Sequence, residues 1–97
     1  MNPYNTRQLD LMIKKITNFE SKYVALHELV ADLEGLENAL SFEDDNWKTA
    51  FMDHWAVLED VNAEMLINGI KVVPDEYIAI LHTEIFAIKS LIQEKLG

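Results

Sequence analysis

The longest helical pattern in the chain is residues 44–69, DDNWKTAFMDHWAVLEDVNAEMLING. Asp44 or Asp45 is placed to cap the start of a helix over residues 46–68. Gly69 suits the left-handed position that ends a helix, and Ile70 after it suits the apolar contact of that motif. Apolar residues recur every three or four positions, which predicts a buried stripe. Its members are Trp47, Phe51, His54 or Trp55, Leu58, Val61 or Asn62, and Met65.

Three further segments show the same periodicity, and only three glycines and two prolines interrupt the chain. One spans about residues 6–19, with Asn5 as its cap and Gln8 as the reciprocal partner. Another spans about residues 25–40, and residues 20–24 before it are either a turn or continuous helix. The last begins at Pro74, which suits a first helical position. Short connections between amphipathic helices predict an all-α fold, an antiparallel four-helix bundle.

Length and composition are those of a small globular protein. The 97 residues predict a single domain, residues 1–97. An apolar content of 49% argues against disorder, and the absence of cysteine excludes disulfides and thiolate chemistry. The chain has no run of about 18 apolar residues and no basic, apolar leader at its start. We therefore expect no membrane span, no secretory signal and a cytoplasmic location.

No motif for catalysis or metal binding is found. The pair His27-Glu28 resembles the start of a zinc-protease motif, but Ala31 occupies the position of the required second histidine. None of His27, His54 and His82 follows a glutamate by three residues, as di-iron bundles require. Nucleophile elbows and glycine-rich phosphate loops are also absent. We therefore expect that the protein is not an enzyme and binds no metal or cofactor. His54 is expected to be a hydrogen-bonded boundary residue, and His27 and His82 to be exposed or half-exposed.

The acidic residues are concentrated in the middle of the chain. Of 17 acids, eleven lie between residues 28 and 64, where Lys48 is the only lysine or arginine. A surface that only maintains solubility mixes both signs of charge. The excess therefore favours an acidic binding surface, although a solvated face explains any single pair equally well. Nucleic acid and anionic membranes are disfavoured as partners because both require clustered lysine and arginine.

Helical geometry separates these acids into two groups. Asp53, Asp60 and Glu64 fall within an arc of about 40° on the third predicted helix, opposite its buried stripe. Glu28 and Asp32 lie one turn apart on the second predicted helix, away from its leucines. We expect these five residues to bind the partner, provided that the two adjacent helices present them together.

Two segments also carry a resemblance to known proteins. They are residues 29–40, LVADLEGLENAL, and residues 44–59, DDNWKTAFMDHWAVLE. Over residues 25–68, and in size, acidity and helical layout, the chain resembles small immunity proteins of bacterial toxin systems. Colicin-type and contact-dependent growth inhibition systems are among them. The resemblance implies tight one-to-one neutralisation of a cognate toxin.

The acidity and the resemblance together predict a basic protein toxin domain as the partner, most simply a nuclease. An acidic inhibitor would cover the surface on which a nuclease holds phosphates, and electrostatic steering would speed the encounter. The free protein is expected to be a monomer or a weak dimer. The alternative is a cytoplasmic chaperone or adaptor for a secreted protein, which would use an exposed apolar groove.

Overall fold

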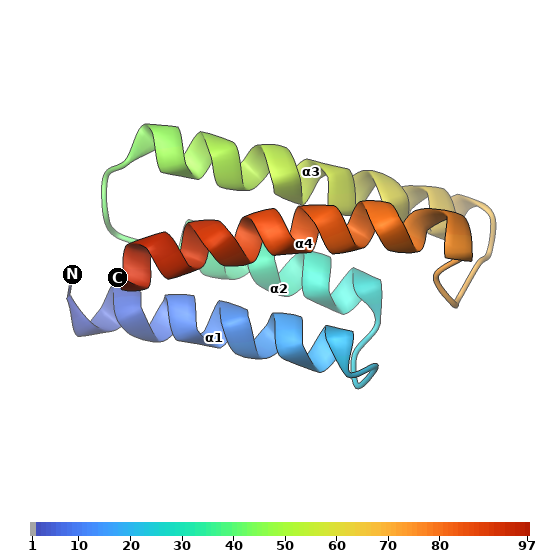
Figure 1. Cartoon of the computed structure of the whole chain (residues 1–97), viewed down its shortest axis with the longest axis horizontal. Coiled ribbons are helices and arrows are strands. Elements are labelled where there is room, and N and C mark those ends of the chain that lie inside the picture. Colours follow the sequence, from blue (N-terminus) through green and yellow to red (C-terminus); the bar gives the residue numbers. More distant parts are fainter. Residues whose placement is uncertain (1) are drawn as a thin grey trace.

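A computed structural model describes residues 2–97 and shows four helices. They are α1 (Pro3–Glu20), α2 (Leu26–Asn38), α3 (Asp45–Ile67) and α4 (Asp75–Leu96). Successive helices run antiparallel, and α4 packs back against α1, so both termini lie at one end of the bundle (Figure 1). The predicted all-α four-helix bundle is confirmed. Within residues 2–97, no helix is both long and apolar enough to cross a bilayer.

The core is one cluster of apolar side chains from all four helices. Full burial of each large side chain is worth about 1.5–3 kcal/mol, so this cluster is the main source of stability. In α3 the predicted stripe is confirmed at Trp47, Phe51 and Leu58, which are buried. Buried residues of the other helices include Leu9, Met12, Ile16, Leu29, Leu33, Ile85, Ile88 and Ile92.

Two tryptophans set the rotation of α3 about its own axis. The Trp47 indole N–H donates to the backbone carbonyl of Leu91 in α4 at 2.8 Å. The Trp55 indole N–H donates to the carbonyl of Val30 in α2, also at 2.8 Å. Buried indole N–H groups need such acceptors. One flank of α3 is therefore held against α4 and the other against α2.

The start of α1 differs from the prediction. The side chain of Asn2, not Asn5, caps the helix, because its Oδ1 accepts from the Asn5 backbone N–H at 2.8 Å. Pro3 occupies the first turn, where its missing N–H costs nothing, so the helix begins earlier. Asn5 is buried, and its Oδ1 accepts from the Ser41 backbone N–H at 2.9 Å and from the Ser41 hydroxyl at 3.1 Å. The predicted cap is therefore wrong, and Asn5 holds the connection between α2 and α3.

Left-handed residues end both α1 and α3. Gly69 has φ 64°, and the Ile70 N–H donates to the Met65 carbonyl at 2.8 Å, as predicted for this ending. The segment after α1 is a turn, and Lys22 takes the glycine-like position there with φ 65°. The Tyr23 N–H donates back into the last turn of α1 at 2.9 Å. Both motifs lie at the bundle end opposite the termini (Figure 1).

Asp44 connects the start of α3 to the end of α4. Its Oδ1 accepts from the Trp47 backbone N–H at 3.0 Å, which confirms the predicted capping position. Its Oδ2 contacts the Lys95 ammonium at 2.6 Å. The Lys95 hydrogen bond, and after it the Trp47 N–H, hold the pKa of Asp44 below its ordinary value.

Candidate partner-binding surfaces

The three acids predicted on the third helix share one exposed side of α3. Asp53, Asp60 and Glu64 are all exposed. At about 100° per residue, their side chains are rotated roughly 120–160° about the axis of α3 from the buried Leu58. They lie on one flank of α3, and Trp55 lies on the opposite flank. Because Trp55 bonds to α2, this acidic flank is turned toward α4.

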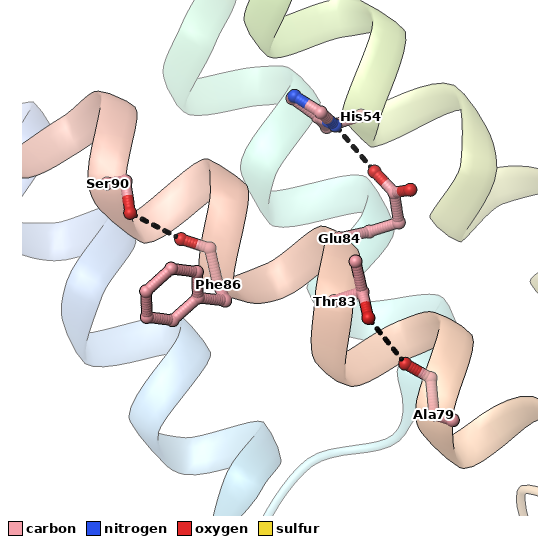
Figure 2. Close-up of polar contacts among 6 residues, drawn as sticks. All are labelled: His54, Ala79, Thr83, Glu84, Phe86 and Ser90. Carbon is pink, nitrogen blue, oxygen red and sulfur yellow. Dashed lines mark hydrogen bonds and ion pairs between the residues drawn. The ribbon is translucent and has the colours of Figure 1, made fainter.

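A contact between His54 and Glu84 confirms the placement on the α4 side. The His54 Nδ1 and a carboxylate oxygen of Glu84 are 2.5 Å apart. Figure 2 shows the two side chains pointing toward each other across the gap between α3 and α4. Their side chains are 37% and 20% exposed, so the predicted role of His54 as a hydrogen-bonded boundary residue is confirmed.

Tyr77 marks the other end of the same face. Burial raises the pKa of its hydroxyl, and the negative charges of Glu64 and Glu76 raise it further. Glu64 belongs to α3, whereas Tyr77 and Glu76 belong to the start of α4. Carboxylates from both helices therefore converge on this corner of the bundle.

Together these residues form a surface that we call the acidic face. Its members are Asp53, Asp60, Glu64, Glu76 and Glu84. Within residues 2–97, the ion pairs made by lysine lie elsewhere: none of the five carboxylates has a lysine or arginine within 4.0 Å. Glu84 contacts the His54 imidazole, so the negative potential of this face comes mainly from the other four carboxylates, which have no ion-pair partner within residues 2–97.

The two predicted acids of α2 do not join this face. Asp32 contacts the Lys15 ammonium of α1 at 3.6 Å, and Glu28 is exposed one turn earlier. That pair lies on the α1 side of α2, whereas the α3 acids lie on the α4 side of α3. The expectation that adjacent second and third helices present all five residues together is therefore not met. Sequence periodicity gives the direction of a side chain from its own helix axis, but not the neighbour on that side.

Two glutamates of α4 belong to the acidic face but were not predicted from the sequence. Glu76 and Glu84 lie outside the acidic middle of the chain, and their spacing of eight residues places them on one side of α4 without indicating which helix that side faces. They join the acidic face only because the antiparallel register of α3 and α4 brings Glu84 to His54 and Tyr77 near Glu64. No signal in the local sequence could have identified them.

A second surface feature is a groove of about 660 Å³ at the end of the bundle that carries the α1–α2 and α3–α4 connections. Its floor includes the core residues Leu26, Met65 and Leu81. Tyr23 and Val72 on its rim are 82% and 81% exposed. Its lining residues with charged or imidazole side chains are Glu20, Lys22, Lys71, Asp75 and His82. The volume lies in the range of small-molecule pockets.

The remaining histidines lie apart from both surfaces described above or at their rim. His27 and His82 are exposed, as predicted. In the part of the chain that the structure describes, no three side chains of histidine, aspartate or glutamate converge in a way that could hold a metal ion. No protein-family model, curated protein or solved structure matches the chain. The charges, exposure and lining residues of the acidic face and the groove are therefore the basis for assigning a function.

Proposed function

We propose that this protein is an immunity protein that binds a basic toxin domain, a nuclease in the simplest case, through the acidic face. The observation that carries the proposal is the set of five carboxylates on α3 and α4 without a lysine or arginine counter-charge. A nuclease holds phosphates with clustered cations, and an exposed group of carboxylates would compete for them. The same field attracts such a partner from a distance and speeds association.

The rigidity of the acidic face supports this proposal. Its α3 members lie between Asp53 and Glu64, so the carboxylates extend about 17 Å along the helix at about 1.5 Å per residue. They form the charged centre of an interface, and neighbouring residues of α3 and α4 would complete the area of about 800 Å² that each partner buries in a typical specific complex. The Trp47 bond to Leu91 and the Asp44 contact with Lys95 tie the two helices together. A rigid face loses little conformational entropy on binding.

The apolar groove favours a second candidate function, a chaperone or adaptor for a secreted protein. Exposed apolar side chains around a groove are typical of surfaces that bind apolar segments. Binding there would depend on burial of apolar area and only weakly on salt. The two functions therefore differ in the surface used and in the salt dependence of binding.

The test is a charge reversal on the acidic face. The variant Asp53→Lys, Asp60→Lys, Glu64→Lys is compared with Glu28→Lys, Glu34→Lys, Glu43→Lys, which changes three exposed acids elsewhere by the same total charge. The readouts are protection of cells that express any toxic domain found encoded beside this gene, and the association rate with that domain. We expect the first variant to lose protection and to associate about 10 to 1,000 times more slowly at low salt. The control variant should protect.

Two outcomes would count against the immunity function. Equal protection by both triple variants would show that the acidic face does not bind the toxin. Binding that resists about 0.5 M salt but is lost in Ile78→Asp would instead favour the chaperone or adaptor, because Ile78 lines the groove. Ile78 is half exposed, so this substitution leaves the core intact.

A further inference from the structure

The groove at the bundle end combines an apolar floor with unpaired cations at its mouth. We propose that it binds a fatty acid of about twelve carbons, with the acyl chain on the apolar floor and the carboxylate at the mouth that Lys22 and Lys71 line. This site is separate from the acidic face, and the proposal does not depend on which protein that face binds.

The floor of the groove provides the apolar surface that an acyl chain requires. It lies between the end of α1 and the start of α4, the least closely packed neighbouring pair in the bundle. The apolar side chains that line it include Phe19 from α1, Leu26 from α2, Met65 from α3, and Leu81 and Ile85 from α4. Each CH₂ group that leaves water for such a surface contributes about 0.8 kcal/mol. The volume of about 660 Å³ is sufficient for a drug-sized ligand.

The mouth of the groove carries the positive charge. Lys22 lies in the turn after α1 and Lys71 in the connection before α4, and neither forms an ion pair within residues 2–97. Of the two lining acids, Glu20 is neutralised by the Lys89 ammonium at 3.0 Å. Asp75 is in the first turn of α4, where the helix dipole favours a negative charge. The whole chain has a net charge of −9, but the two lysines at this mouth can still attract an anion.

Other occupants, including the extended segment that a chaperone or adaptor would bind here, fit this groove less well. An extended peptide would lay backbone N–H and C=O groups on an apolar floor, where they would lack hydrogen-bond partners. A second copy of the chain would bring another net charge of −9 against the first. A fatty acid has no polar group along its chain and a single anionic end, which matches one apolar floor with one cationic mouth.

The direct test is calorimetric titration of the full-length protein with dodecanoate below its micelle concentration. Dodecyltrimethylammonium, which has the same chain length and the opposite charge, is the control ligand. The net charge of the protein favours the cation everywhere except at the groove, so preferential binding of dodecanoate is diagnostic. Amide NMR shifts should be confined to residues around the groove. Absence of binding, equal or tighter binding of the cation, or shifts elsewhere would overturn the proposal.

Variants then test the role of the lysines. Lys71→Glu should weaken dodecanoate binding about tenfold, the effect of losing one charge-assisted contact. Lys22→Gly should also weaken dodecanoate binding. Glycine is chosen because it adopts the positive φ of residue 22 without strain. Arg7→Glu is the matched control, because Arg7 is exposed at the start of α1 and the charge change equals that of Lys71→Glu. Equal losses in Arg7→Glu and Lys71→Glu would overturn the proposed carboxylate site.

Discussion

Lys22 has a backbone conformation that suits glycine better than lysine. Its φ of 65° brings the Cβ close to the following carbonyl, which costs about 1–2 kcal/mol for a residue other than glycine. We predict that Lys22→Gly raises the free energy of unfolding by about 0.5–1 kcal/mol, since added freedom of the unfolded chain offsets part of the gain. Urea denaturation measures the change. Lys22→Ala keeps the Cβ and should gain much less; a destabilised glycine variant would contradict the prediction.

Asn5 has a structural role that its neighbours in sequence do not reveal. Its Oδ1 accepts two hydrogen bonds from Ser41, which is 36 positions away. In Asn5→Ala the Ser41 N–H loses its acceptor, and we predict a loss of about 1–3 kcal/mol in unfolding free energy. Amide hydrogen exchange at Ser41 should accelerate.

The matched control for this prediction is Asn2→Ala, which removes the N-cap of α1 and should cost about 1 kcal/mol. It leaves the contact of Asn5 with Ser41 in place. If Ser41 exchanges equally fast in both variants, the proposed anchoring role of Asn5 is wrong.

At the scale of whole helices, Asp44 couples the start of α3 to the end of α4. Its pKa is lowered in the folded state, so the folded protein favours the deprotonated form more than the unfolded chain does. This contribution to stability is therefore present above about pH 4, the unfolded pKa, and is lost as the pH falls through the lower folded pKa. We predict that Asp44→Asn reduces the loss of stability on acidification, measured by urea denaturation from neutral to acid pH.

Asp44→Asn is suited to this test because asparagine also caps helices, so the variant removes the charge and the Lys95 ion pair while retaining the cap. Asp45→Asn removes an equal charge one position later, from an exposed residue without an ion pair. Asp45→Asn should change the pH dependence of the unfolding free energy less than Asp44→Asn does. Identical profiles for the two variants would contradict a specific role for the contact between Asp44 and Lys95.

At the scale of the whole molecule, a net charge of −9 on 97 residues opposes compaction. Salt screens this repulsion, so we predict that the free energy of unfolding rises between about 0.01 and 0.5 M NaCl. Denaturant titration at several salt concentrations checks the prediction.

The variant Asp53→Lys, Asp60→Lys, Glu64→Lys tests where the repulsion originates. It reverses three charges on the acidic face and should show a shallower dependence of stability on salt. A dependence as steep as that of the unaltered protein would mean that repulsion on this face is not the main destabilising charge effect.

Features set by neighbours in sequence were predictable. The buried stripe of α3, the Asp44 cap and the left-handed Gly69 each depend on residues within one or two helical turns, so periodicity and capping chemistry identify them. The bundle follows because four amphipathic helices with short connections bury their stripes most simply against one another.

Features set by packing between helices were not predictable. The Asn5 contact with Ser41 joins distant segments, and the register of α3 against α4 brings Glu76 and Glu84 beside the α3 acids. The sequence alone therefore establishes that the chain forms acidic amphipathic helices. Tertiary structure decides which acids share a face, because that depends on which neighbour each helix turns toward. Here the indole bonds of Trp47 and Trp55 hold α3 between α4 and α2.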